Sequence, residues 1–361
     1  MEQKVLLTPG PITTSNSVKQ AMQIDLGTRD SEYQSIVQDV RTKLLALAQV
    51  EEQDYSCILL QGSGTYSVES VLTSVVAPNQ KVLILINGAY GERMEQICIK
   101  AHIPYVKEAF DMCNELPLQA VEKAIASEDI THVAYIHCET TAGILNNLVG
   151  IQALITKYNK ISIVDAMSSF ASVPINVNAL NIDYLITSSN KCLHGVPGIG
   201  IIFARKFELD KCCGNAHSLS LDLYDQYKTM EASAGSFRFT SPTHVILALN
   251  KAIDELNEEG GIAKRSARYV AIQQRIRTAM ISKGFQTLID PSIQSPVITT
   301  FLYPDNFDFP AFYDYFKEHG FLLYNGKLPG IDAFRIGNIG SINDSDVDRF
   351  ITLLNNYKEC A

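Results

Sequence analysis

The sequence of 361 residues contains no apolar run that approaches the length of a membrane-spanning helix. Such a helix needs about 20 mostly apolar residues. The N-terminal stretch MEQKVLLTPGPITTS also has no apolar core of the kind that a secretory signal requires. We therefore expect a soluble protein that does not act at a membrane and is not exported by a standard signal.

The chain has fewer basic than acidic residues. The chain has 30 lysine and arginine residues against 39 aspartate and glutamate residues, which gives a formal net charge of -9. A nucleic acid is bound through a surplus of basic side chains that neutralise its phosphates. The composition therefore argues against a nucleic-acid partner, although one buried arginine could still hold a small anionic substrate.

Cysteines and histidines at metal-binding spacings are absent as well. None of the eight cysteines has the spacing of a metal site, and the adjacent pair Cys212 and Cys213 does not suit a disulfide. His137, His194 and His244 show no ligand spacing, and no serine lies in a G-x-S-x-G context. We expect reduced thiols, no metal, structural histidines and a cytoplasmic location.

What the sequence does contain is a regular alternation of short apolar runs and amphipathic stretches. Strands are predicted at residues 56–61, 81–86, 132–138, 161–166, 183–189 and 198–205. β-rich runs separated by helices are typical of a mostly parallel sheet that helices cover on both faces. Because the chain is long for a single core, we predict an α/β large domain over residues 1–250 and a second domain after it.

The pattern changes after residue 250. Two long charged helices are followed by short strands and helices, and the last helix begins near NDSDVDRF, whose first side chains can accept hydrogen bonds from its free amides. Residues 251–361 are therefore predicted to form a small α+β domain. No linker rich in proline or serine separates the two parts, so we expect them to pack tightly.

Lys191 is the first candidate for chemistry. It lies in SSNKCLHGVPGIG, between an apolar strand and a glycine-rich run. Most lysines are simply exposed to solvent. A lysine whose pKa is lowered by desolvation, however, can form a Schiff base with a carbonyl compound.

Two further features support this interpretation. Asp165 ends the apolar run ISIVDA, where an unpaired buried carboxylate is costly, although a helix N-cap is an alternative role. Residues 61–65, QGSGT, would expose backbone amides at the start of a helix, which suits a phosphate, although many turns are glycine-rich for steric reasons alone. Ligands bind at the carboxyl ends of such strands. An amine, a carboxylate and a phosphate cradle together indicate pyridoxal 5'-phosphate.

The motifs are also similar to those of a known family. The blocks are LLTPGPITTS, LLQGSGTYSVES, NGAYGERM, HCETTAGILNN, DAMSSF, SSNKCLHGVPGIG, FRFTSPTH and FRIGNIG. They run in order from about residue 5 to 355 and resemble the class V aminotransferases of fold type I. Within that family they look most like the enzymes that act on 2-aminoethylphosphonate and pyruvate, and serine–pyruvate and alanine–glyoxylate aminotransferases are near relatives.

The resemblance implies a fold and a set of site residues. The fold is that of PLP fold type I, with a large domain built on a mostly parallel sheet of the seven-stranded type and the N-terminal segment 1–20 packed near the active site. The implied catalytic residues are Lys191, on which the cofactor is held, and Asp165, which faces its pyridine nitrogen. The implied cofactor-binding residues are Ser63, Gly64, Thr65 and Asn190 at the phosphate, Thr240 from the neighbouring subunit, Tyr90 stacked on the ring and Thr140 near the phenolic oxygen.

Some of these positions also have simpler interpretations. Tyr90 could be a core tyrosine, and it stands where some relatives have tryptophan. Arg335 lies in the apolar run AFRIGNIG and could merely cover a strand with its stem, but the resemblance assigns it to the acidic group of the substrate. A guanidinium fork suits that task. Gly10 would approach the same group through its backbone.

The implied reaction converts 2-aminoethylphosphonate and pyruvate to phosphonoacetaldehyde and L-alanine in a homodimer with active sites at the interface. An aminotransferase that uses alanine or serine with glyoxylate or pyruvate is the main alternative. A pyridoxal-phosphate lyase or desulfurase is less favoured, because Cys192 is too close to Lys191 to be a mobile catalytic cysteine. A non-catalytic protein that binds a phosphate ligand is a further alternative.

Overall fold

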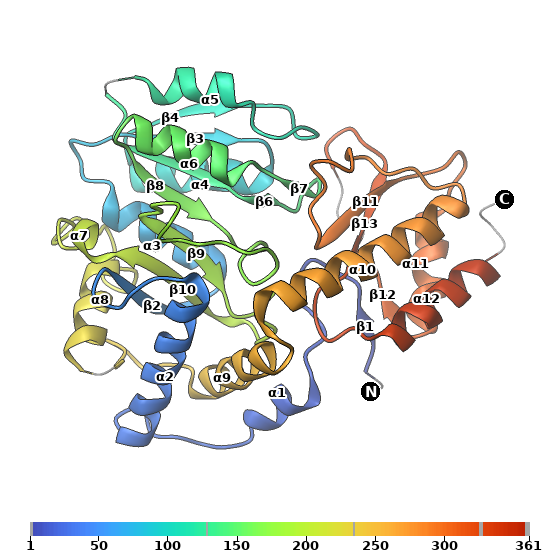
Figure 1. The fold of residues 1–361 in the computed structure, drawn as a ribbon, viewed down its shortest axis with the longest axis horizontal. Coiled ribbons are helices and arrows are strands. Elements are labelled where there is room, and N and C mark those ends of the chain that lie inside the picture. Colours follow the sequence, from blue (N-terminus) through green and yellow to red (C-terminus); the bar gives the residue numbers. More distant parts are fainter. Residues whose placement is uncertain (1–2, 128, 234, 325–327, 358–361) are drawn as a thin grey trace.

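A seven-stranded sheet forms the centre of the larger part of the molecule (Figure 1). The computed structural model describes residues 3–127, 129–233, 235–324 and 328–357. The strands lie side by side in the order β2-β10-β9-β8-β5-β3-β4. Their bounds are β2 Tyr55–Gly62, β3 Val82–Ile86, β4 Tyr105–Ala109, β5 His132–Ile136, β8 Ile161–Asp165, β9 Tyr184–Ser188 and β10 Gly198–Arg205.

The direction of the strands decides where functional residues can meet. The five strands from β9 to β4 are parallel, and β10 is antiparallel to both of its neighbours, β2 and β9. β2 therefore runs in the same direction as β9. The carboxyl ends of six strands consequently face one edge of the sheet, which is the edge where open α/β sheets bind ligands.

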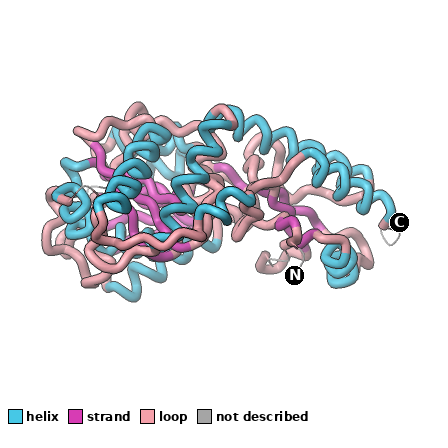
Figure 2. Tube along the Cα trace, turned by 90° about the horizontal axis from the view of Figure 1, so that it is seen from below, coloured by secondary structure: helices cyan, strands magenta, loops and turns pink. Residues whose placement is uncertain are grey.

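Helices cover the sheet on both faces, as Figure 2 shows from below. α3 packs on β2, β9 and β10, whereas α6 packs on β8 and α4 on β3 and β5. The helices of this part are α1 Asn16–Ala21, α2 Ser31–Ala48, α3 Gly64–Val75, α4 Ala89–Ala101, α5 Leu118–Ile125, α6 Leu148–Lys157, α7 Lys206–Leu209, α8 Leu223–Ala232 and α9 Thr243–Glu258.

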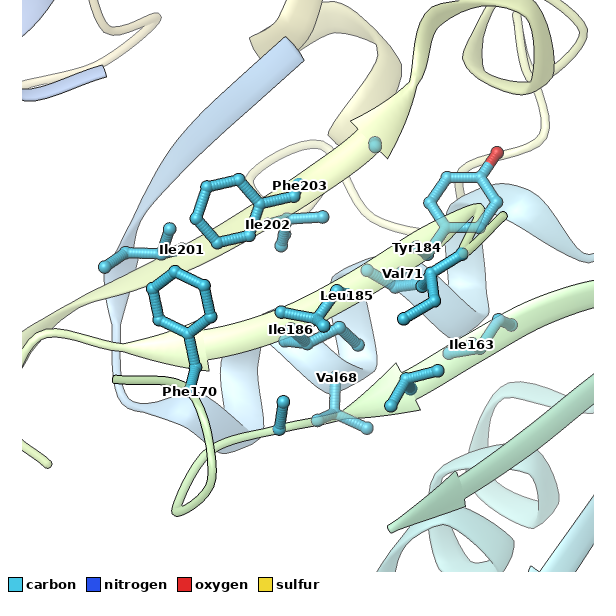
Figure 3. Close-up of a cluster of buried hydrophobic side chains, with 14 of the residues drawn as sticks. Val68, Val71, Ile163, Phe170, Tyr184, Leu185, Ile186, Ile201, Ile202 and Phe203 are labelled. Carbon is cyan, nitrogen blue, oxygen red and sulfur yellow. The ribbon is translucent and has the colours of Figure 1, made fainter. Parts of the chain in front are cut away.

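The apolar runs predicted from the sequence form the core of this sheet. Figure 3 shows Leu185, Ile186 and Phe203 packed against neighbouring side chains. The rings of Phe170 and Phe203 lie 4.9 Å apart between centroids. Strands with helices on both sides are buried on both faces, so they need continuous apolar sequence rather than alternation.

The smaller part of the molecule has its own apolar core, rich in phenylalanine. Two strand pairs lie in it: β1 with β12, which are parallel, and β11 with β13, which are antiparallel. A further hairpin, β6 and β7, lies next to this part. The bounds are β1 Val5–Leu6, β6 Cys138–Glu139, β7 Ile144–Leu145, β11 Ile298–Leu302, β12 Phe321–Leu322, β13 Ala333–Gly337, α10 Gly261–Ser282, α11 Phe309–Glu318 and α12 Asp344–Asn356.

The predicted fold class is confirmed, and all six predicted strands are present. β4 was not predicted, because four of its five residues are exposed and its sequence, YVKEA, is largely polar. The predicted division after residue 250 falls inside the continuous helix α9, and the domain boundary stays a prediction.

Three expectations from composition can be compared with the described residues. Their seven cysteines are all free, and Cys360 lies outside them. Within the same residues, no cluster of three His, Cys, Asp or Glu side chains could hold a metal ion. No helix of the described chain is both long enough and apolar enough to span a membrane.

Candidate active site

A pocket opens at the carboxyl edge of the sheet, and it brings together seven of the residues singled out from the sequence. These are Ser63, Gly64, Thr65, Tyr90, Asp165, Asn190 and Lys191. They follow the ends of four different strands, β2, β3, β8 and β9, so the topology of the sheet is what assembles them.

Lys191 lies three residues beyond the end of β9, in a tight turn. Its Nζ donates a hydrogen bond to the carbonyl oxygen of Pro9 at 2.7 Å. Burial lowers the pKa of Lys191, and the nearby Arg93 lowers it further. The amine therefore loses its proton more readily than an exposed lysine does, which a nucleophile or a general base requires.

Asp165 is the last residue of β8 and is only 6% exposed. Its Oδ1 accepts a hydrogen bond from the backbone amide of Met167 at 2.9 Å. Burial raises the pKa of this carboxyl to about 7, and the Met167 amide and the charges of Arg93 and Lys191 offset only part of that effect. A buried carboxylate with so little compensation is suited to a cationic ligand group.

The loop from β2 leads directly into α3, whose first residue is Gly64. Ser63 is the N-cap residue, yet its side chain makes no capping hydrogen bond. Its hydroxyl is therefore not needed by the helix. Free amides and the positive end of the helix dipole make this terminus a suitable site for a phosphate.

Tyr90 and Thr140 meet beside the pocket. Tyr90 lies in the first turn of α4, and burial raises the pKa of its hydroxyl, an effect that the nearby side chain of Thr140 in the β6–β7 hairpin partly offsets. Glu139 holds the two elements together, because its buried carboxylate accepts the amide of Tyr90 at 3.2 Å and that of Thr141 at 3.0 Å. The structure thus joins Thr140 to the predicted set through Tyr90.

Arg335 lies in the middle of β13 and is 6% exposed. Its Nη1 donates to the carbonyl oxygen of Thr140 at 2.6 Å, and its guanidinium lies 4.7 Å from the centre of the Tyr324 ring. Its buried Nε has no acceptor in the described part of the chain. The smaller part of the molecule therefore presents a cation with spare donors at the hairpin that also holds Tyr90.

Gly10 belongs to the N-terminal segment, residues 8–12, which lies against the turn of Lys191. A Cβ atom at Gly10 would lie 2.3 Å from the Lys191 amine, and its φ of +134° disfavours other residues. Glycine is what allows this close approach to Lys191, and the predicted contact of Gly10 with the acidic group of the substrate stays a prediction.

Thr240 is not brought into the pocket of its own chain. It is exposed and lines a separate hollow together with Gln61, Gly62 and Tyr66. Its predicted role thus depends on a second subunit.

Sequence reasoning missed several residues at the site. Arg93 lines the pocket, donates from Nη1 to the hydroxyl of Thr65 at 3.3 Å and lies over the Tyr90 ring at 5.0 Å. Its position three residues after Tyr90 on a helix was a usable signal, since such residues share a face. Met167 lines the pocket and Glu139 braces it, and neither had a signal beyond its neighbours Asp165 and Thr140.

His137, His194 and His244, the histidines considered from the sequence, do not line the pocket. His244 contacts Asp25 on the surface, and His137 is buried. His194 contacts Tyr269 at 2.5 Å in the interior.

The arrangement fits pyridoxal phosphate on structural grounds. The buried Asp165 carboxylate matches a pyridinium nitrogen, and the Lys191 amine matches the aldehyde. The uncapped start of α3 matches the phosphate, and the Tyr90 side chain offers an aromatic face.

Comparisons with known proteins agree with this interpretation. The Aminotransferase class-V family matches residues 14–327. A 2-aminoethylphosphonate–pyruvate transaminase from Phocaeicola vulgatus is 50% identical over 354 residues, which are 97% of this chain and 98% of that protein. A bifunctional phosphonoacetaldehyde hydrolase/aminoethylphosphonate transaminase from Clostridioides difficile is 49% identical over 98% of this chain, and this chain spans 56% of its length.

Solved structures match the fold over nearly the whole chain. An alanine–glyoxylate aminotransferase from Nostoc sp. superposes with a TM-score of 0.90 at 22% sequence identity. The match covers 99% of this chain and 95% of that one.

Proposed function

We propose that this chain, which belongs to the aminotransferase class-V family, transfers the amino group of 2-aminoethylphosphonate to pyruvate and forms phosphonoacetaldehyde and L-alanine. The similarity to transaminases of that name supports the substrates. The observation that carries the proposal is Arg335, a buried guanidinium with an unpaired Nε, beside a pocket that holds Lys191 and Asp165.

An anionic group on the substrate would satisfy Arg335. A buried donor without an acceptor costs about 1–3 kcal/mol, so the free site gains by binding oxygen atoms. A guanidinium fork can pair with two oxygens of a phosphonate in one half-reaction and with the two oxygens of a carboxylate in the other. One arginine can therefore serve both substrates in turn.

Bound pyridoxal phosphate supplies an aldehyde that accepts the amino group and a ring that withdraws electrons from the substrate carbon. We assign the proton transfer to Lys191, because burial lowers the pKa of its amine and the amine therefore gives up its proton more readily than an exposed lysine does. Its Nζ would take the proton from the carbon that bears the substrate amine. Asp165 would hold the ring nitrogen in its protonated form, and Tyr90 would orient the ring by stacking.

Ser63, Gly64, Thr65 and Asn190 are proposed to hold the cofactor phosphate, with Thr140 near the phenolic oxygen. Thr240 would complete the phosphate site from the other subunit of a homodimer, because it is exposed on its own chain and lies outside its own pocket. We further propose a cytoplasmic location, which the free cysteines support.

The test is an assay of alanine release from pyruvate over a panel of amino donors, namely 2-aminoethylphosphonate, serine, β-alanine and glycine. We expect 2-aminoethylphosphonate to give the highest kcat/KM. A second measurement replaces pyruvate with glyoxylate, offers alanine or 2-aminoethylphosphonate as the donor and follows the formation of glycine. Faster transfer from serine, or faster transfer from alanine to glyoxylate, would replace the substrate assignment while leaving an aminotransferase.

A further inference from the structure

His194 lies three residues after Lys191 and closes the same turn. Its amide donates to the carbonyl oxygen of Lys191 at 2.9 Å, and its φ of +69° is in the left-handed region. A positive φ is uncommon for residues other than glycine, and histidine is among those that adopt it more often than most. The side chain is only 4% exposed, so the imidazole is held inside the protein.

The imidazole faces two donors from other elements. The amide of Gly340 donates to Nε2 at 3.1 Å, and the hydroxyl of Tyr269, on α10, lies 2.5 Å from the same atom. Gly340 follows β13, the strand that carries Arg335, by three residues. Nε2 of His194 therefore connects the turn of Lys191 both to the loop after β13, in the smaller part of the molecule, and to the long helix α10.

Neighbouring contacts fix both partners in place. Arg265 Nη1 donates to the carbonyl oxygen of Cys192 at 2.9 Å, and Asn338 Nδ2 donates to the carbonyl oxygen of Tyr269 at 3.0 Å. Arg268 Nη1 donates to the carbonyl oxygen of Gly340 at 3.4 Å. The turn, the helix and the loop after β13 are thus held as one buried network.

The imidazole has to be neutral for this arrangement. An Nε2 that accepts an amide proton carries no proton of its own, so the tautomer is the one protonated on Nδ1. Burial lowers the pKa of His194 well below its ordinary value, and the charges of Arg265 and Arg268 act in the same direction. Glu259 pairs with both arginines and limits this effect.

We propose that His194 is a positioning residue that fixes the turn of Lys191 relative to the strand of Arg335. This inference rests on the proposed roles of those two residues. The separation matters because Lys191 has to reach the amine-bearing carbon while Arg335 holds the acid group of the same substrate. The tolerance is small, because the acid group of 2-aminoethylphosphonate is only one carbon further from that carbon than the carboxylate of alanine is.

The test compares His194→Leu, which removes the acceptor, with His194→Gln, whose side-chain oxygen can still accept a hydrogen bond. Single-turnover rate constants with each substrate should fall about tenfold or more in His194→Leu and stay within about threefold in His194→Gln, because the first variant leaves two buried donors unpaired. In the cofactor-free protein, an amine-acylating reagent followed by peptide mapping should label Lys191 faster in His194→Leu than in the natural chain.

His132→Leu is the matched control. His132 is also buried, but it is the first residue of β5 and therefore lies at the amino end of that strand, away from the pocket at the carboxyl ends. This variant should lose stability and keep normal rate constants. Should His194→Leu fail to fold, Tyr269→Phe removes one donor with little change in packing and should still speed labelling of Lys191.

Three results would overturn the proposal: a folded His194→Leu with rate constants within about twofold of normal, equal losses in the leucine and glutamine variants, or unchanged labelling of Lys191. A natural chain that transfers no amino group would instead overturn the proposed function. The labelling of Lys191 would then still decide the role of His194.

Discussion

Asp165 gives a clear prediction for a single residue, because burial of its carboxylate destabilises the folded chain most when no cofactor is bound. Its pKa of about 7 in the folded chain is above its ordinary 3.8, so between these values the folded chain binds more protons at this group than the unfolded chain does. The free energy of unfolding of the cofactor-free protein should therefore fall as pH rises through this window.

Asp165→Asn removes this dependence, because an amide does not ionise. We expect the cofactor-free variant to gain stability relative to the natural chain between pH 4 and pH 8, by an amount on the order of a few kcal/mol at most. Thermal unfolding at several pH values measures this. Pyridoxal phosphate should then stabilise the natural chain more than the variant, and turnover of the variant should be severely reduced. If the free energy of unfolding of the two proteins changed with pH in the same way, burial would not destabilise the ionised form of Asp165.

Arg335→Lys should weaken both half-reactions by about 2–5 kcal/mol, since truncation of a buried charge pair leaves its partner unpaired. A lysine ammonium is a point charge and cannot form the paired contacts of a guanidinium. Single-turnover spectra with 2-aminoethylphosphonate and with alanine give the two losses separately.

Arg349→Lys serves as the control, because Arg349 is half exposed and lies over the buried Phe321 ring in the same part of the molecule. A loss confined to one substrate would show that Arg335 does not recognise both acid groups.

The site residues that could be predicted from patterning share one property, which is that each ends or closely follows a buried strand. Asp165 is the last residue of β8, and Ser63 and Lys191 follow β2 and β9, so the ends of these strands bring all three to one edge. Glu139 was not predictable in this way. Its importance comes from hydrogen bonds to the amides of Tyr90 and Thr141, and the first of these contacts joins residues far apart in the sequence.

At the scale of elements, a substitution at the start of α3 can distinguish a role in cofactor binding from a role in helix stability. Removal of an N-cap side chain usually costs about 0.5–2 kcal/mol, but Ser63 makes no capping hydrogen bond. We expect Ser63→Ala to leave the stability of the cofactor-free protein nearly unchanged and to weaken the binding of pyridoxal phosphate. Thermal unfolding and a cofactor titration measure the two effects.

Asn147→Ala is the comparison, because the Asn147 side chain accepts the Gly150 amide at 2.8 Å at the start of α6. This variant should lose stability and bind cofactor normally. A destabilised Ser63→Ala with unchanged cofactor affinity would mean that the hydroxyl serves the helix.

β4 shows where element prediction fails. It is an edge strand of the sheet, and four of its five side chains face solvent, so it needs no apolar run. Charged residues on an edge also discourage pairing with other chains. The same polar sequence that protects the edge hides the strand from a search for hydrophobic patterns.

For the whole molecule, Thr240 provides a test of shared sites. A dimer mixed from Lys191→Ala and Thr240→Ala subunits contains one site with both changes and one site with neither, if Thr240 serves the neighbouring pocket. Lys191→Ala dimers should be inactive, and loss of a hydrogen bond to a charged phosphate should weaken cofactor binding in Thr240→Ala dimers by about 1.5–3 kcal/mol.

Mixing should therefore restore fully active sites at low cofactor concentration, which a titration of activity against pyridoxal phosphate measures. Unmixed proteins combined immediately before the assay are the control. If mixed dimers bind cofactor only as weakly as Thr240→Ala dimers, Thr240 acts within its own chain or not at all.

At this scale the sequence predicts the parts better than their connections. The α/β sheet and the smaller α+β part follow from hydrophobic patterns. The contact of Arg335 with Thr140 and that of His194 with Gly340 depend on how distant segments pack, and no local pattern encodes them.

The placement of the N-terminal segment has a consequence for biosynthesis. Val5 pairs with Phe321 and Thr13 lies beside Gly340, so the earliest of these residues reach their partners only after more than three hundred others have been translated. At about 5–20 residues per second, that wait is roughly 15–60 s. The contacts of Pro9 and Gly10 with Lys191 are therefore made late on the ribosome, and a nascent chain that has already folded its sheet still lacks them.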